Sequence, residues 1–158
     1  MSHVRPAVPG DLHALAGLLA PLPLLARYGE SHERLEKNLH SALERHDGLL
    51  VYDAAEHGPK GLAWYMATGT LGMGGYLKLL AVAPSAQGSG VGAALLAGYE
   101  AAVFAVSAHA FLLVSDFNTA AQRFYERHAY RRVGALPALV LPEVTELIYW
   151  KPRPPPAR

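Results

Sequence analysis

Residues 76–105 read YLKLLAVAPSAQGSGVGAALLAGYEAAVFA. Residues 76–82 are strand formers, and Pro84 ends the run. Glycines follow at positions 88, 90 and 92, which frees the backbone to turn sharply. From Val91 onward, alanine and leucine favour a helix. A strand, a glycine-rich turn and a helix in this order point several backbone amides and a helix N-terminus at one place, so the stretch predicts an anion-binding site.

Two common phosphate-binding motifs fit this turn poorly. A P-loop requires Lys and then Ser or Thr after its last glycine, whereas Val91 and Gly92 follow Gly90. A dinucleotide fingerprint matches residues 88–93 by spacing, and Asp116 would serve as its ribose-binding acid. In that fold, however, the strand leads directly into the first glycine, while residues 83–87 intervene here. Asp116 also comes later in the sequence than the ribose-binding acid of that fingerprint, and no second βαβ half follows.

A third motif accounts for the intervening residues. The string L-A-V-x-P-x-x-Q-G-x-G-x-G, which starts at residue 80, resembles the acetyl-CoA motif of the GNAT superfamily of N-acetyltransferases, whose core is [RQ]-x-x-G-x-[GA]. Gln87, Gly90 and Gly92 stand at the named positions of that core. The resemblance implies that the turn amides hold the coenzyme A pyrophosphate and that the strand end pairs with the pantetheine arm. The residues so implied are Gln87, Gly88, Ser89, Gly90, Val91 and Gly92 in the turn, and Leu80, Ala81 and Val82 in the strand.

The stretch from residue 118 to 130, NTAAQRFYERHAY, also resembles a GNAT string, N-x-x-A-x-x-F-Y-x-x-x-G-[FY]. Asn118 suits a helix N-cap, and Tyr125 lies two turns further along the same face. The resemblance makes Tyr125 the general acid and Asn118 a coenzyme A contact. A phenol with an unperturbed pKa of about 10 stays protonated at neutral pH and can protonate a leaving thiolate. Alternatively, Phe124 and Tyr125 are an aromatic pair that packs the helix on the sheet.

This sequence departs from the family pattern at two places. Ala129 replaces the glycine after the helix, where a left-handed alanine costs roughly 1 kcal/mol, so we expect a differently shaped helix end. Many GNAT enzymes carry an acid just before L-A-V, whereas this chain has Lys78 and Leu79. The general base therefore stays open. The candidates for it are a bound water and the side chains of Glu30, His32, Glu143 and Glu146.

Composition limits the class of protein. With 158 residues, of which 51% are hydrophobic and 17% charged, we expect a single domain over 1–151 and a flexible Pro-rich tail over 152–158. Fourteen basic and thirteen acidic residues give a charge of +1 without a basic block, which argues against nucleic acid as a partner. The absence of cysteine excludes disulfides, thiolate nucleophiles and thiolate metal sites.

Two further features lead to expected absences. Prolines at 21 and 23 interrupt the apolar stretch 12–26, so we expect neither a secretion signal nor a membrane span, and a cytoplasmic protein. His32, His40 and His46 follow one another at spacings of eight and six, which do not gather imidazoles on one helix face as i, i+4 ligands would. We therefore expect no metal site.

The coarse element order is βααβββαβαββ, which matches the GNAT layout over nearly the whole chain. Asp11 is expected to cap the first helix, and residues 21–30 are expected to be irregular. The predicted fold is an α/β sandwich with a mixed, mainly antiparallel, twisted sheet of about seven strands flanked by about four helices. Its central parallel pair is formed by residues 76–82 and 111–115. The expected strands are 3–7, 48–53, 60–68, 76–82, 111–115, 130–134 and 145–151.

The predicted activity is transfer of the acetyl group of acetyl-CoA to a primary amine, on a small molecule or a peptide N-terminus. Without cysteine, we expect direct attack in a ternary complex. The alternative, favoured by Lys78, Leu79 and Ala129, is an inactive acetyl-CoA sensor or assembly subunit. Residues 21–31 and 136–144 would flank the acceptor groove, and the second segment is equally a candidate homodimer contact.

Overall fold

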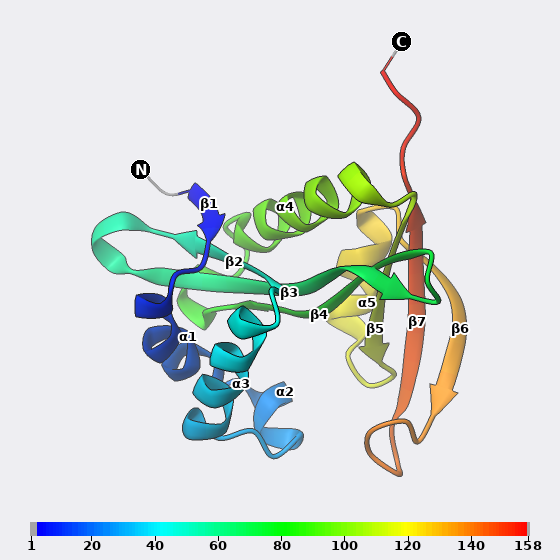
Figure 1. Ribbon diagram of the computed structural model, residues 1–158. Coiled ribbons are helices and arrows are strands. Elements are labelled where there is room, and N and C mark those ends of the chain that lie inside the picture. The colour runs from blue at the N-terminus through cyan, green and yellow to red at the C-terminus, as the bar shows by residue number, and fades with distance from the viewer. Residues whose placement is uncertain (1–2, 158) are drawn as a thin grey trace. The chain divides into compact units, whose positions relative to one another are not determined.

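The structure is a computed structural model that describes residues 3–157 (Figure 1). Its strands are β1 His3–Pro6, β2 Gly48–Asp53, β3 Pro59–Thr70, β4 Gly74–Val82, β5 His109–Ser115, β6 Arg131–Pro137 and β7 Thr145–Pro152. Its α-helices are α1 Leu12–Leu19, α2 Pro23–Arg27, α3 His32–Glu44, α4 Val91–Val106 and α5 Thr119–Arg127. Three short 3-10 turns lie at Pro9–Asp11, Ala55–His57 and Pro84–Ala86.

The strands form one seven-stranded sheet in the order β1-β2-β3-β4-β5-β7-β6. β4 and β5 are parallel, with Gly75 opposite Ala110 and Leu77 opposite Leu112. The β1–β2, β2–β3, β5–β7 and β6–β7 pairs are antiparallel. The predicted mixed sheet with a parallel pair is therefore confirmed.

The chain divides into two compact units, which are described separately below. Unit 1 contains the chain up to Met66 together with Leu79–Ala101, and unit 2 contains Ala67–Lys78 together with the chain from Ala102 onward. The division falls inside β3, β4 and α4, so each of these elements contributes to both units. A single domain over residues 1–151 stays a prediction.

The core of unit 1 lies where α1 and α3 pack together and cover strands β2 and β3. The helices contribute buried leucines at i, i+3 and i+4 spacings, which is the pattern of an amphipathic helix. Trp64 is buried on β3, and its indole Nε1 donates a hydrogen bond to Asp47 at 2.9 Å. The core residues of the two helices are Leu12, Leu15, Ala16, Leu19, Leu35, Leu39 and Ala42.

Two local predictions for unit 1 were wrong. The Asp11 side chain does not cap α1; it accepts hydrogen bonds from the Val8 amide and the Arg5 guanidinium, because it closes the preceding 3-10 turn. The segment 21–30 contains the short helix α2, with Pro23 at its first position. Proline is tolerated there because the first amides of a helix have no intrahelical partner. Ser31 caps α3, since its Oγ accepts a hydrogen bond from the Arg34 amide at 3.2 Å.

In unit 2, β5 is paired on both sides, with β4 and with β7. Gly75 lies under Val103 of α4, where a Cβ atom would come within 2.4 Å of the Val103 side chain. Only a hydrogen atom fits, so helix and strand approach closely. The chain beyond β7 starts with Arg153, whose amide donates to the Ala108 carbonyl at 2.8 Å. Flexibility of the tail stays a prediction.

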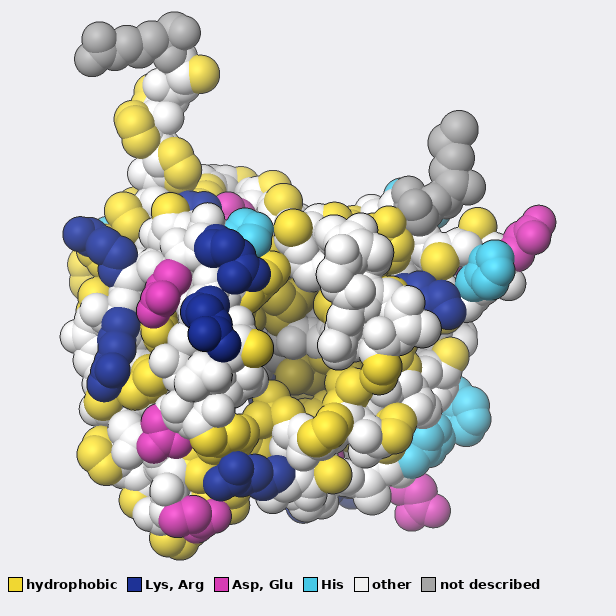
Figure 2. All heavy atoms as spheres, turned by 180° about the vertical axis from the view of Figure 1, so that it is seen from behind, with side chains coloured by type: hydrophobic (Ala, Val, Ile, Leu, Met, Phe, Trp, Pro, Cys, Tyr) yellow, Lys and Arg dark blue, Asp and Glu magenta, His cyan; other side chains and the backbone are white. Residues whose placement is uncertain are grey.

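Lys and Arg side chains are interspersed with Asp and Glu side chains on the face drawn in Figure 2. Among residues 3–157, no helix combines the length and the hydropathy that a membrane crossing requires.

Candidate active site

The glycine-rich turn of unit 1 has a backbone that favours glycine. Gly88 and Gly90 have φ angles of 76° and 88°, in the left-handed region that L-residues with a side chain rarely adopt. A Cβ atom at either position would have no heavy atom within 4 Å, so this part of the turn faces open space. An anion could approach the backbone there without meeting a side chain.

The turn leads directly into α4, as predicted. The Ala94 amide donates to the Gly90 carbonyl at 3.0 Å, and this bond starts the helix. The amides of Val91, Gly92 and Ala93 precede it and have no carbonyl one turn earlier inside the helix. Together with the helix dipole, these amides suit a negative charge.

Close packing against β3 fixes the start of α4. A Cβ atom on Gly61 would lie 2.8 Å from Leu95 Cδ1, 2.9 Å from the Ala81 carbonyl oxygen and 3.0 Å from Val91 Cγ1. Val91 and Leu95 are both buried. The first turn of α4 and the end of β4 therefore rest on a glycine that leaves no spare volume.

Hydrogen bonds from two side chains to backbone carbonyls also stabilise the turn. Gln87 Nε2 donates to the Val82 carbonyl over a long 3.4 Å, and Ser89 Oγ donates to the Ala86 carbonyl. Leu80, Ala81 and Val82 end β4 in unit 1, and the Ala83 amide pairs with the Lys60 carbonyl at 2.8 Å. The structure therefore gives the Val82 carbonyl a partner within the turn.

In unit 2, Asn118 begins α5, as expected from the sequence. Its Oδ1 accepts a hydrogen bond from the Ala121 amide at 3.1 Å. At the other end of the helix, Ala129 has φ 67°, so it adopts the left-handed conformation that the family glycine would adopt. The expectation of a differently shaped helix end was wrong. The Tyr130 and Ala129 amides bond back to the carbonyls of Tyr125 and Glu126, and these bonds hold the alanine in place.

Tyr125 is the one residue of α5 that is buried, with 8% of its surface exposed. Its ring makes edge contacts with Phe124 and Tyr130, at centroid distances of 5.2 and 5.8 Å. Burial, with a smaller contribution from Tyr76, raises the pKa of the Tyr125 phenol far above its usual value. Among residues 3–157, its hydroxyl has no hydrogen-bond partner. Tyr125 thus packs as an aromatic residue, and its phenol stays protonated at neutral pH.

Glu146 is buried near this tyrosine cluster. It lies opposite Ser115 on the neighbouring strand, is 5% exposed, and accepts hydrogen bonds from Ser115 Oγ at 3.3 and 3.2 Å to its two carboxylate oxygens. Burial and the charge of Glu146 raise the pKa of Tyr76. Tyr76 therefore lies within electrostatic reach of both Glu146 and Tyr125, and unit 2 gathers these four polar side chains.

The other base candidates differ from Glu146 in their surroundings. Glu143 is exposed, and Glu30 lies 3.7 Å from the Arg34 guanidinium. His32 contacts the His13 carbonyl between two helices of unit 1. Tyr76 was not identified from the sequence as a site residue, because within its apolar strand nothing distinguished it from a packing residue.

The family model described as "Acetyltransferase (GNAT) family" matches residues 16–130. The match covers both the glycine-rich turn and α5, and the chain belongs to this family of acetyltransferases. No curated protein matches the sequence significantly.

Solved structures share the fold. A Desulfovibrio desulfuricans protein assigned to the GNAT acetyltransferases is 22% identical, with a TM-score of 0.78, over 96% of this chain and 99% of that one. Ribosomal-protein-alanine N-acetyltransferase from Brucella melitensis is 19% identical, with a TM-score of 0.71, over 94% and 98%. An aminoglycoside 6′-N-acetyltransferase complexed with coenzyme A is 15% identical, with a TM-score of 0.76, over 98% and 99%. At these identities the likeness shows the fold, which is the predicted GNAT-type sandwich.

Proposed function

We propose that this protein is an acetyl-CoA-dependent N-acetyltransferase that transfers acetyl to a primary amine by direct attack in a ternary complex. The observation that carries the proposal is Tyr125, a buried phenol whose hydroxyl has no hydrogen-bond partner among residues 3–157. Such a group stays protonated at neutral pH and is suited to protonate a departing thiolate. Membership in the acetyltransferase family supports it. Because acetyl-CoA is an intracellular co-substrate, we keep the cytoplasm as the expected location.

The turn residues suit the coenzyme A pyrophosphate. Gly88 and Gly90 leave open space beside the backbone, and the first amides of α4 lack intrahelical partners. In the proposal, amides from Gln87 to Gly92 bind the pyrophosphate, Leu80–Val82 pair with the pantetheine arm, and Asn118 is a further contact. Acetyl-CoA supplies an activated thioester, and the protein supplies binding and proton transfer.

The attacking amine must lose a proton, and Glu146 is the base that we favour. Its carboxylate is buried, held by Ser115, and close enough to Tyr76 to influence its pKa. A water between Glu146 and the amine would carry the proton, as general base catalysis allows one bridging water. Glu146 would then remove the proton of the nucleophile, while Tyr125 protonates the leaving group.

Either a small-molecule amine or a peptide N-terminus fits the proposal as acceptor. The fold neighbours include an enzyme named for aminoglycosides and one named for the alanine of a ribosomal protein. In unit 2, Leu136 near the end of β6 is 37% exposed, and Leu139 and Val140 in the loop that follows are 51% and 58% exposed. These apolar side chains suit contact with an acceptor or with a second copy of the chain.

The central experiment is Tyr125→Phe, which removes the hydroxyl and keeps the ring. We expect turnover to fall by roughly 10²-fold or more, with a nearly unchanged KM for acetyl-CoA, because only the proton donor is lost. The measurement is thiol release with an acceptor amine found by screening with labelled acetyl-CoA. Wild-type turnover in this variant, with chemistry rate-limiting, would reduce Tyr125 to a packing residue.

A second variant tests the anion site alone. Gly90→Glu adds bulk, charge and strain at a left-handed position, and we expect the KM for acetyl-CoA to rise steeply. Gly72→Glu is the matched control, because Gly72 also has a positive φ, 68°, and open space around it, but lies outside the turn. An equal rise in both variants would contradict the pyrophosphate assignment.

The alternative is a protein that binds acetyl-CoA without turnover. Lys78, which stands where many family members have an acid, is exposed on β4. Calorimetry that shows tight acetyl-CoA binding, together with no thiol release for any amine across neutral and alkaline pH, would favour this alternative. A single good acceptor would eliminate it.

A further inference from the structure

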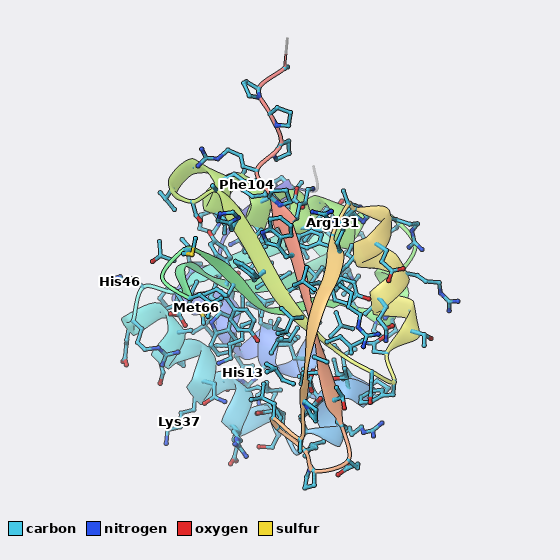
Figure 3. All side chains as sticks on the ribbon, turned by 90° about the vertical axis from the view of Figure 1, so that its right-hand side faces the viewer. His13, Lys37, His46, Met66, Phe104 and Arg131 are labelled. Carbon is cyan, nitrogen blue, oxygen red and sulfur yellow. The ribbon has the colours of Figure 1, made fainter. Side chains whose placement is uncertain are left out.

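Two helices of unit 1 bring together three side chains that the proposed reaction does not use. α1 carries His13 and α3 carries His32 and Glu36, and Figures 1 and 3 show the two helices side by side. His13 is labelled in Figure 3. Its side chain is 79% exposed, while those of His32 and Glu36 are 36% and 30% exposed. The cluster therefore lies at the surface, with its two α3 members partly shielded.

The donor atoms of the cluster are close together. His13 Nδ1 lies 3.1 Å and His32 Nδ1 3.9 Å from the same carboxylate oxygen, Glu36 Oε2. One donor atom from each residue can be chosen so that all three lie within 4.8 Å of one another. In a tetrahedral zinc site with bonds of about 2.1 Å, donor atoms are about 3.4 Å apart. Small side-chain rotations would bring these three atoms to that spacing.

A hydrogen bond orients one of the imidazoles for this role. His32 Nε2 lies 3.3 Å from the His13 backbone carbonyl, which can only accept a hydrogen bond. Nε2 therefore carries the proton in the neutral ring, and the lone pair is on Nδ1, the nitrogen that faces Glu36. A backbone carbonyl that fixes the tautomer in this way is typical of histidines that bind metals.

The two helices that carry the proposed ligands are held in place by their buried faces. Leu12 and Leu15 of α1 and Leu35 and Leu39 of α3 are buried in the same core cluster. His32 is the first residue of α3, directly after the Ser31 cap. Ligands on rigid, packed elements lose less conformational freedom on binding than ligands on loops.

We propose that His13, His32 and Glu36 bind one divalent transition-metal ion, Zn²⁺ in the first place. Two imidazole nitrogens and one carboxylate oxygen are a ligand set that Zn²⁺ accepts, with water at the remaining position. Hard ions such as Mg²⁺ prefer oxygen ligands and are not expected there. The expectation of no metal site rests on the spacing of His32, His40 and His46 along the sequence, whereas His13, the neighbour of His32 in this cluster, lies on another helix.

Calorimetric titration of the tag-free, full-length chain with ZnCl₂ tests the proposal. We expect one ion per chain and no heat with MgCl₂. His13→Gln, His32→Gln and Glu36→Gln should each weaken Zn²⁺ binding at least about tenfold, since even indirect disturbance of a metal site costs that much. His40→Gln is the matched control, because His40 is exposed on the same helix and outside the cluster, and it should bind as wild type does.

A spectroscopic readout separates a defined site from loose binding. Co²⁺ in place of Zn²⁺ should give visible absorption bands in the wild type and in His40→Gln, and these bands should be lost in His13→Gln. Three results would each overturn the proposal: no Zn²⁺ binding by the wild type, equal losses in His40→Gln and His13→Gln, or unchanged binding in all three ligand variants. None of them bears on acetyl transfer, because Tyr125 and the glycine-rich turn are not involved.

Discussion

Arg5 shows how a single side chain can join elements that are distant in sequence. Its guanidinium makes a two-pronged contact with Asp11, at 2.8 and 2.9 Å, and its Nε donates to Asp53 at 2.8 Å. Asp11 closes the turn before α1, and Asp53 ends β2. The pattern R-P-A-x-x-x-D at residues 5–11 therefore has a physical role in this contact.

This ion cluster predicts an acid-sensitive part of the stability. Hydrogen bonds from Arg5 lower the pKa of both Asp11 and Asp53 in the folded state. Their contribution is therefore complete above the unfolded pKa of about 3.9, and it is lost as the pH falls through the lower folded values. In urea unfolding between pH 6 and pH 2, we expect the stability of wild type to fall more steeply than that of Arg5→Gln. The exposed Arg34→Gln is the control, and a curve for Arg5→Gln that parallels wild type would contradict the prediction.

Asn118 has two possible roles that one substitution can separate. Its Oδ1 caps α5, while the proposal also gives its side chain a coenzyme A contact. Asn118→Ser keeps an N-cap oxygen and should cost only a few tenths of a kcal/mol, whereas Asn118→Ala should cost about 1 kcal/mol. If the amide group contacts the co-substrate, the KM for acetyl-CoA rises in both variants. A KM at the wild-type value in Asn118→Ser would leave Asn118 as a cap alone.

At the scale of elements, the sequence predicted strands and helices well but not the contacts between them. The helix predicted from Val91 onward matches α4, and the predicted strands 48–53 and 60–68 match β2 and β3 to within two residues at each end. The apolar patterns and the caps are local, so they can be seen in one stretch. The short helix α2 differs from the irregular segment expected over 21–30, because Pro23 stands at the first position of a helix, where proline is tolerated.

In the candidate site, too, some features follow from the local sequence and others depend on the tertiary structure. Positive φ angles at Gly88 and Gly90 and the cap at Asn118 follow from local sequence, and the structure has them. The pairing of Glu146 with Ser115 depends on strand register, and the meeting of His13 with His32 depends on helix packing. Such contacts require the tertiary structure.

Two glycine-to-alanine substitutions are expected to change the stability of the protein in opposite directions, and together they test how tightly the elements pack. Gly61→Ala should destabilise the protein by about 1–3 kcal/mol, because the new methyl group meets the Ala81 carbonyl and the side chains of Val91 and Leu95. Gly17→Ala lies in α1, where a Cβ atom would be 3.8 Å from the His32 ring, an ordinary contact. It should stabilise the protein by about 0.5–1 kcal/mol. Chemical denaturation measures both.

The effect of Gly61→Ala on binding gives a further check. Because Val91 and Leu95 fix the first turn of α4, the KM for acetyl-CoA should rise in Gly61→Ala and stay unchanged in Gly17→Ala. Loss of stability without a change in KM would mean that the start of α4 does not position the anion site.

For the molecule as a whole, the central question is whether the two compact units unfold together. β3, β4 and α4 each run through both units, so a break in one unit disturbs elements of the other. The chain has two tryptophans, one in each unit: Trp64, bonded to Asp47, and Trp150, bonded to His109. They provide one fluorescent reporter for each unit.

We expect a single cooperative transition. Trp64→Phe leaves Trp150 as the reporter of unit 2, and Trp150→Phe leaves Trp64 as the reporter of unit 1. In each variant, the urea midpoint from fluorescence should coincide with that from circular dichroism, which reports on the whole chain. Separate midpoints would show two domains and would contradict the predicted single domain.

The contact of Gly61 with Val91 and Leu95 also sets an order of events during synthesis. The chain leaves the ribosome from its N-terminus, so β3 emerges before the helix that covers it. At about 5–20 residues per second, Leu95 is added about 2–7 s after Gly61. Throughout that interval, the surface of β3 around Gly61 has no helix to cover it. A nascent chain that stalls between Gly61 and Leu95 presents this uncovered strand to chaperones and proteases. A chain that extends slightly beyond Leu95 can cover the strand with the start of α4.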